Sequence, residues 1–192
     1  MSTRGAYGFR IDGADKVTYN HFDSYPEGLG EDIVRFIRST PYEEMVRAAR
    51  SIVLVSETDK PTPEQFNHCR EYFLRCHGTP LPDPSWDWYN VLRSVQGDLF
   101  AYLNGLCYMI DDHDFLRDSL LCEWAYIINL DSRTFEVYRG FQKRRDSNPR
   151  NRYRFLPSHS TGYYPVALIA EYLLDAIPDD WAAQIYLFSE VA

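Results

Sequence analysis

The sequence predicts an α+β protein in which a small antiparallel sheet is packed by several helices. Two segments, at about 6–22 and 123–138, alternate apolar and polar residues around a turn, which is typical of β-hairpins. Several other segments repeat apolar residues at helical spacing. Because the strands are grouped in hairpins, we expect no β-α-β crossover. The chain has 192 residues, so we expect 1–192 to form a single domain.

The first hairpin is predicted from apolar residues at every second position between Tyr7 and Ile11. Asp12 and Gly13 form its turn, and the alternation resumes on the return strand. The stretch 23–30 is rich in glycine and proline and should be a shaped loop.

Signals for the start of a helix follow at three places. A short helix is expected at about 31–39, where acidic residues in the first turn suit the helix dipole. Thr40, with Pro41 after it, predicts the cap of a second helix. The same pattern at Thr62 predicts a third helix, which Gly78 ends.

The longest helix is expected after Asp83, its predicted cap. Apolar residues keep helical spacing from Trp88 to Leu106, over about six turns. After the second hairpin, a polar loop at 142–162 is followed by Tyr164-Pro165 and a further apolar helical pattern. The chain from Trp181 onward is also expected to be helical.

Composition argues against several classes of protein. The formal net charge of −8 disfavours nucleic acid as a partner. No apolar run approaches the roughly 20 residues that cross a bilayer, so no membrane partner is expected. The four cysteines show no C-x-x-C spacing, which argues against a zinc ribbon or a thioredoxin-type site. The acidic run 111–114 has the residue types of metal ligands, but four consecutive side chains on a regular element cannot all face one ion. We expect no metal, no cofactor and a cytoplasmic location with reduced thiols.

Candidate catalytic residues lie where the first hairpin ends. If the strand persists, His21 and Asp23 point the same way, and the carboxylate raises the basicity of the imidazole. Ser24 would then be a nucleophile, or Asp23 would orient His21 as a general base. Arg4 should come close to Asp23 and could hold a carboxylate or phosphate. The alternative is a structural strand end, with Arg4 in an ion pair that holds the loop.

Two groups of side chains are candidates for binding. Tyr19, Asn20 and Tyr25 flank the residues just described. The segment 143–154 is the basic cluster of an otherwise acidic chain, and it would grip phosphates or an acidic partner, or be plain solvated surface. Its cations are Lys143, Arg144, Arg145, Arg150, Arg152 and Arg154.

Two stretches of the sequence carry a family resemblance. Residues 1–10 and 19–30, with the loop Asp23-Ser-Tyr-Pro-Glu-Gly-Leu-Gly30, resemble a family of uncharacterised bacterial and bacteriophage proteins. Those proteins begin with a Thr-Arg-Gly strand and carry an Asp-x-Tyr-Pro-x-x-x-Gly loop. The resemblance implies a bacterial or phage source and no particular reaction.

We therefore expect a binding protein with a protein partner, such as a regulator or inhibitor of a host protein. Its support is the absence of a strong catalytic signature, the high tyrosine content and the basic loop on an acidic body. One alternative is a small hydrolase or transferase that uses His21 and Asp23. The other is a nucleotide or oligonucleotide binder that uses 143–154.

Overall fold

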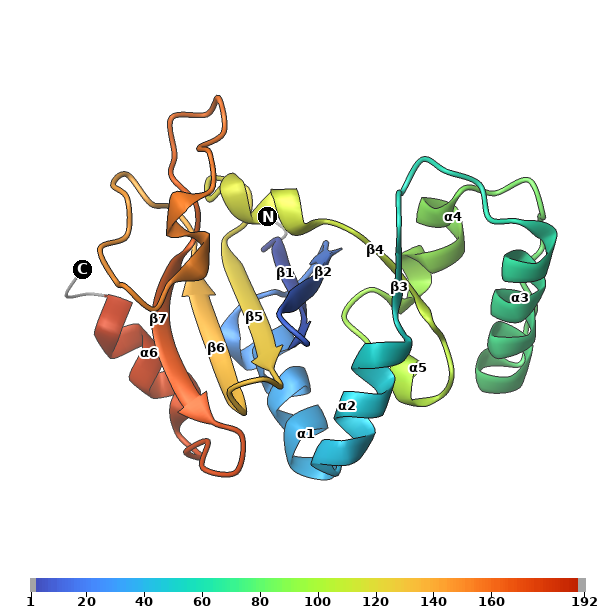
Figure 1. Ribbon diagram of the computed structural model, residues 1–192, viewed down its shortest axis with the longest axis horizontal. Coiled ribbons are helices and arrows are strands. Elements are labelled where there is room, and N and C mark those ends of the chain that lie inside the picture. The colour runs from blue at the N-terminus through green and yellow to red at the C-terminus, as the bar shows by residue number, and fades with distance from the viewer. Residues whose placement is uncertain (1–2, 190–192) are drawn as a thin grey trace.

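A computed structural model describes residues 3–189, and its main element is a five-stranded sheet in the order β2-β1-β5-β6-β7 (Figure 1). The α+β class is confirmed, and so are both predicted hairpins, β1–β2 and β5–β6. The strands of this sheet are β1 (Gly5–Ile11), β2 (Ala14–Asn20), β5 (Trp124–Asn129), β6 (Thr134–Arg139) and β7 (Ala167–Leu173).

The expectation of a purely antiparallel sheet was wrong at one junction. Strands β1 and β5 pair in parallel, from Gly5 opposite Trp124 to Arg10 opposite Asn129. All six residues of β5 are buried, because β5 is the central strand and is covered on both faces. The roughly hundred residues between β2 and β5 form the long crossover that parallel pairing requires.

The helices lie mostly in this crossover. They are α1 (Glu31–Ser39), α2 (Tyr42–Ser51), α3 (Pro63–His77), α4 (Trp88–Leu92) and α5 (Phe100–Leu103), with α6 (Trp181–Ser189) at the end of the described chain. Shorter helical turns are η1 (Pro26–Gly30), η2 (Arg93–Val95), η3 (His113–Arg117) and η4 (Arg152–Phe155). A second sheet pairs β3 (Val53–Val55) with β4 (Tyr108–Ile110) in parallel.

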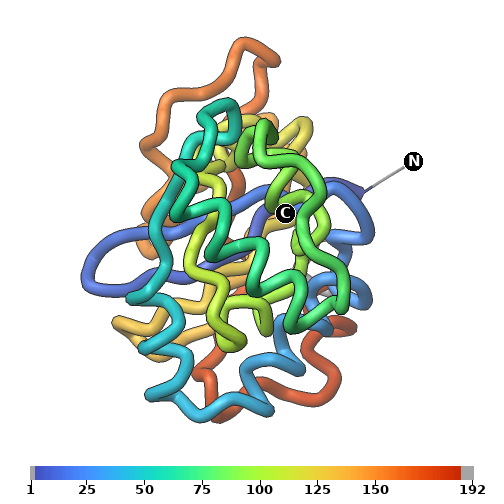
Figure 2. Tube along the Cα trace, turned by 90° about the vertical axis from the view of Figure 1, so that its right-hand side faces the viewer, coloured from blue at the N-terminus to red at the C-terminus, as the bar shows by residue number. Residues whose placement is uncertain are grey.

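The two faces of the five-stranded sheet have separate hydrophobic clusters. Helices α1, α2 and α6 cover one face, and the loop after β6 with η3 and η4 covers the other. Helices α3 and α4 stand at the far end of the molecule, next to β3 and β4. Figure 2 shows this end, with the 63–95 segment in front of the strands.

The cap signals were confirmed at one helix and wrong at another. Thr62 and Gln65 form a complete capping box at the start of α3, and Gly78 ends that helix with a φ of 71°. Helix α2 begins after Pro41 without any side-chain cap, so Thr40 does not cap it. The Thr40 hydroxyl is buried and has no hydrogen-bond partner among the described residues.

The long helix predicted after Asp83 is broken into α4, η2 and α5. Asp87, not Asp83, caps α4 by accepting from the backbone N–H of Asn90 at 2.9 Å. The break falls at Gly97, whose φ is 84°. The apolar spacing continues through the break because both halves contribute to the same hydrophobic cluster, whereas α4 ends at Leu92, η2 ends at Val95 and Gly97 lies in the gap before α5.

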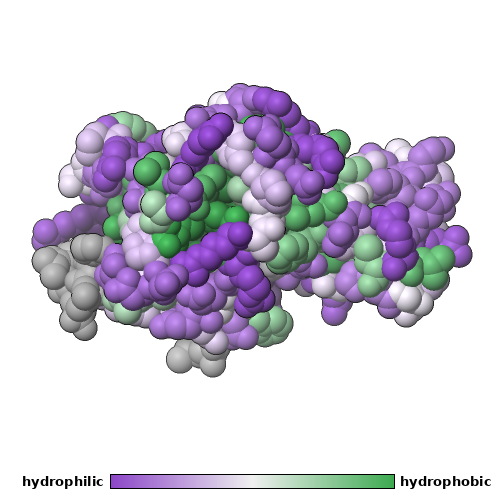
Figure 3. Space-filling model, turned by 90° about the horizontal axis from the view of Figure 1, so that it is seen from below, coloured by the Kyte–Doolittle hydropathy of each residue, from purple (hydrophilic) through white to green (hydrophobic). Residues whose placement is uncertain are grey.

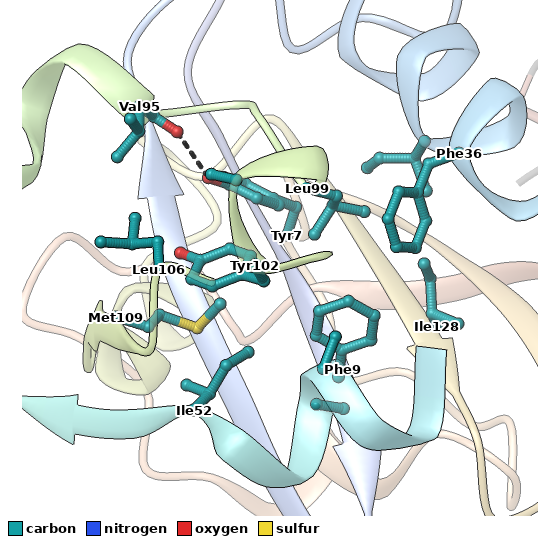
Figure 4. Close-up of a cluster of buried hydrophobic side chains, with 14 of the residues drawn as sticks. Tyr7, Phe9, Phe36, Ile52, Val95, Leu99, Tyr102, Leu106, Met109 and Ile128 are labelled. Carbon is teal, nitrogen blue, oxygen red and sulfur yellow. Dashed lines mark hydrogen bonds between the residues drawn. The ribbon is translucent and has the colours of Figure 1, made fainter. Parts of the chain in front are cut away.

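The hydroxyl of Tyr7 occupies the backbone break. It accepts from the N–H of Gly97 at 2.8 Å and donates to the carbonyl of Val95 at 3.5 Å. Figure 4 shows Tyr7 reaching from its strand to Val95 through the core cluster that includes Tyr102 and Leu99. Tyr7 is only 1% exposed, so this phenol satisfies backbone groups in the interior of the protein.

The segment after Tyr164-Pro165 was predicted as a helix and is strand β7. It pairs with β6, with Tyr172 opposite Phe135 and a bulge beside Val137. Its Ala, Leu and Glu residues favour a helix while its Ile and Tyr favour a strand, so local propensity did not decide. Hydrogen bonding to the free edge of β6 made the segment a strand. The helix expected from Trp181 is confirmed as α6.

Replacing Thr40 by Val should raise the free energy of unfolding by about 1 kcal/mol, because a buried hydroxyl without a partner is costly. Thr18→Val is the matched control. The Thr18 hydroxyl is also buried, but it donates to Asp112 at 3.2 Å, so this change should be destabilising. Urea denaturation of both variants measures the difference. If both variants changed the free energy of unfolding equally and with the same sign, the claim that, of these two hydroxyls, only that of Thr40 lacks a partner would be contradicted.

Stability should fall as the pH rises above about 10. Burial raises the pKa of Tyr72 to about 12 and raises the pKa of Tyr7, Tyr126 and Tyr153 well above its usual value. Tyrosines in the unfolded chain ionise near pH 10, so above that pH the unfolded state binds fewer protons than the folded state and is favoured. Below that pH this stabilisation is fully present.

Urea midpoints at increasing pH, with tyrosinate absorbance recorded in parallel, test this dependence. The absorbance of the buried tyrosines should rise together with unfolding. If these tyrosines ionised gradually while the chain stayed folded, and the urea midpoints did not change, the predicted fall in stability above pH 10 would be contradicted.

Candidate functional site

The chain turns sharply where β2 ends, and Asn20 organises the turn. Its side-chain amide donates to the carbonyl of Phe22 and to Oγ of Ser24, the latter at 2.8 Å. Asp23 has a left-handed φ of 51°, and its carbonyl accepts from the N–H of Leu29 at 2.8 Å. The strand stops at Asn20, so the strand alternation that was expected to align His21 with Asp23 does not extend to them.

Ser24 lies in the interior of the fold. Its side chain is completely buried, its N–H donates to the carbonyl of Thr3 at 3.1 Å, and its carbonyl accepts from the Tyr126 hydroxyl at 3.0 Å. A Cβ on Gly5 would lie 2.6 Å from Cβ of Ser24. In this conformation, a substrate cannot reach the hydroxyl that was predicted as a nucleophile.

His21 is exposed and sits among aromatic rings. Its Nδ1 lies 2.7 Å from the hydroxyl of Tyr19, and its ring packs edge-on against Phe22 at 4.3 Å between centroids. Burial raises the pKa of Tyr19. The hydrogen-bond partner of the His21 Nδ1 atom is therefore the Tyr19 hydroxyl, and not the Asp23 carboxylate that was predicted from the sequence.

Arg4 does not meet Asp23. Among the described side chains no ion pair joins them. Arg4 instead lines a separate cavity of about 290 Å³, together with Tyr19 and Asp112. Burial raises the pKa of Asp112, whose carboxylate accepts from the N–H of Tyr19 at 2.9 Å. The backbones on either side are adjacent, since the N–H of Ser24 donates to the carbonyl of Thr3, but Arg4 and Asp23 line different cavities and the expected ion pair does not form.

The end of the hairpin forms one wall of an open cleft of about 600 Å³. The opposite wall is the segment 96–100, which contains the break at Gly97, and the start of α1 also lines the cleft. The walls approach closely, since a Cβ on Gly97 would lie 3.2 Å from Oδ1 of Asn20. The predicted residues that line the cleft are Asn20, Asp23 and Tyr25; His21 and Arg4 do not.

Charged groups of both signs line this cleft. Asp32 and Arg35 pair with each other at 2.8 Å, and Asp98 accepts from the N–H of Phe100 at 2.9 Å. Asp23 and Arg93 also line it, and neither forms an ion pair with a described side chain. One acid and one base are thus left to interact with a bound molecule.

Three aromatic side chains at the cleft are open to solvent. Phe22 is 63% exposed, Tyr25 39% and Phe100 36%. Large aromatic side chains of this kind carry much of the binding energy in protein interfaces. Arg93 and the 96–100 wall were not predicted from the sequence, and the signal that could have located them is Gly97 inside an apparently helical pattern.

The predicted basic cluster is divided by the fold. Arg152 turns inward, where it pairs with Asp15 at 2.8 Å and with Glu136 at 2.5 Å. Arg150 pairs at the surface with Glu171. Other cations of the cluster lie over aromatic rings, namely Lys143 over Tyr163, Arg145 over Tyr164 and Arg154 over Phe155, while Arg144 is exposed.

Glu136 is the centre of a buried polar network on this face of the sheet. It is 3% exposed and accepts from Asn129 at 2.7 Å, from the Tyr138 hydroxyl at 2.8 Å and from Arg152. Arg152 also donates twice to Asp15. Burial of a carboxylate is tolerated here because every side of it is hydrogen-bonded. Arg152 is consequently part of the fold and not of an open binding surface.

Other groups named from the sequence give no site. No cluster of three or more metal-ligating side chains occurs in the part of the chain that was searched, residues 111–114 included. The same residues contain no helix that is long and apolar enough to span a membrane. A cysteine–histidine contact that the sequence did not indicate joins Cys107 Sγ to His68 Nε2 at 3.4 Å, and burial raises the pKa of that thiol.

The fold and the cleft define a mixed α+β protein with an aromatic-rimmed cleft. Comparison with protein-family models, curated proteins and solved structures finds no match to this chain.

Arg152→Ala should lower the free energy of unfolding by about 3–5 kcal/mol, since it leaves the buried Glu136 without its cation, whereas Asp15 keeps its ion pair with Arg10. Arg150→Ala, two residues away, removes a surface ion pair and should cost less than about 1 kcal/mol. Chemical denaturation compares the two variants. If both variants lost a similar amount of free energy of unfolding, the ion pairs of Arg152 with Glu136 and Asp15 would not be what holds the loop.

Proposed function

We propose that this chain is a protein-binding module that takes a segment of a partner protein into the cleft at the end of the first hairpin. The observation that carries the proposal is the group of three solvent-exposed aromatic side chains, Phe22, Tyr25 and Phe100, around a hollow of about 600 Å³. Exposed aromatics beside a concave surface are typical anchors of protein interfaces.

The charges of the cleft suit a polypeptide. Asp23 and Arg93 offer one acceptor and one donor that no described side chain neutralises. A peptide segment presents both N–H and C=O groups, and its side chains can carry either charge. A highly anionic ligand such as a nucleic acid would meet three carboxylates here, from Asp23, Asp32 and Asp98.

The resemblance of residues 1–10 and 19–30 to bacterial and bacteriophage proteins supports a bacterial partner. The cleft is built from the second of these stretches, so the most family-like part of the sequence forms one of its walls. We infer that the partner is a host protein and that binding regulates or inhibits it.

The geometry supports the two other functions less. A hydrolase or transferase at His21 and Asp23 would lack Ser24, which is buried, and Arg4, which faces another cavity. An oligonucleotide site at 143–154 would lose Arg152 to the buried network and share Arg150 with Glu171.

Phe22→Ser should abolish capture of the partner from a bacterial lysate by the immobilised full chain, because it removes the most exposed of the cleft aromatics. Phe155→Ser is the matched control, since Phe155 is 72% exposed and does not line the cleft. Quantitative mass spectrometry compares both with the unchanged protein. A captured protein lost with Phe155→Ser but retained with Phe22→Ser, or no captured protein at all, would refute the proposal.

A further inference from the structure

A second cavity opens on the underside of the molecule, away from the proposed protein-binding cleft. It holds about 520 Å³ and lies between the α1–α2 junction, the β5–β6 turn and the end of β7. Figure 3, seen from below, shows a hydrophobic hollow bordered by hydrophilic residues in this region. The apolar side chains that line the cavity are Ile37, Tyr42, Met45, Leu173 and Leu174.

A cation without an acidic partner stands at this cavity. The guanidinium of Arg133 lies 4.0 Å above the centre of the Tyr42 ring, and no described carboxylate pairs with it. The backbone of Arg133 is left-handed, with a φ of 58°, because it lies in the hairpin turn. The other arginine here, Arg38, is already engaged, by the carbonyl of Ile177 at 3.1 Å and by Asp179 at 2.9 Å.

Two further polar groups belong to the same cavity. Thr40 lines it, and its hydroxyl is the buried group without a hydrogen-bond partner described above. Asp175 also lines it and is exposed, so one carboxylate accompanies the two arginines. The formal charge of these three ionised side chains is +1, and the cation that remains unpaired by a carboxylate is Arg133.

We propose that this cavity binds a small amphipathic carboxylate, with an apolar body against Met45 and Leu174 and its carboxylate on Arg133. The volume lies within the range of small-molecule sites, and an apolar wall with a few polar groups is their usual composition. A guanidinium fixed over an aromatic ring is pre-oriented to donate two parallel hydrogen bonds to a carboxylate. The apolar wall supplies affinity and Arg133 supplies selectivity for the anion.

The test titrates the ¹⁵N-labelled full chain with decanoate, decan-1-ol and decylamine, each below the concentration at which it forms micelles. Decanoate should bind most tightly of the three and shift the amide signals of 37–45, 132–133 and 173–175. Absence of decanoate binding, equal or tighter binding of decylamine, or shifts confined to other regions would overturn the proposal. Tighter binding of decylamine would assign the selectivity to Asp175.

Matched variants identify the groups responsible. Arg133→Asn keeps a residue that tolerates a positive φ and should weaken decanoate binding about tenfold, because a hydrogen bond to a charged group is lost. Arg144→Asn removes the same charge from an exposed position outside the cavity and should leave binding unchanged. If both variants weakened decanoate binding equally, the preference for the anion would come from the net charge of the protein, and the role proposed for Arg133 would be overturned.

Leu173→Glu tests the apolar wall. Leu173 is 58% exposed, so the change is tolerated by the fold, and its carboxylate should abolish decanoate binding. Leu74→Glu, at a 53% exposed position on α3, is the control and should retain binding. Retention of binding by Leu173→Glu would show that the ligand lies elsewhere.

Discussion

The hydrogen bonds between the Tyr7 hydroxyl and the backbone of Val95 and Gly97 fix one wall of the cleft. A helix that continued through Gly97 would satisfy those groups itself, and the 96–100 segment would not turn back toward the hairpin. Tyr7 replaces that helical bonding with one side chain from the first strand. Because the Tyr7 side chain is buried, its hydroxyl is held in place, and the break has a fixed position. The cleft is a consequence of this break.

The opposite face of the sheet combines its own hydrophobic cluster with a buried ion-pair network. Arg152 connects the loop after β6 to β2 through Asp15 and to β6 through Glu136. A buried ion pair adds little net stability compared with apolar packing, but removal of one partner leaves a charge without compensation. It therefore specifies how the loop lies on the sheet. Among the side chains of this loop, Tyr153, Leu156 and Val166 join the hydrophobic cluster beneath it.

Local signals predicted much of the fold, and long-range contacts account for the errors. Both hairpins, the capping box at Thr62 and the helix end at Gly78 depend on neighbours in sequence, and each was predictable. The parallel pairing of β1 with β5 and the strand β7 depend on residues far apart in the chain. At the end of the first hairpin, the polar stretch at 20–25 could be singled out from its sequence alone, and part of it lines the cleft. The inward turn of Arg152 depends on partners that lie 137 and 16 residues away. Such long-range pairs cannot be predicted from the spacing of residues along the sequence.

Amide hydrogen exchange at Gly97, in the unchanged protein and in Tyr7→Phe, tests the central claim most directly. The Gly97 N–H should exchange slowly in the unchanged protein, because it donates to a buried hydroxyl. In Tyr7→Phe it should exchange much faster, while amides of the central strand β5 keep most of their protection. Rapid exchange at Gly97 in the unchanged protein, or the same rate in both, would contradict the claim that this hydroxyl holds the wall of the cleft.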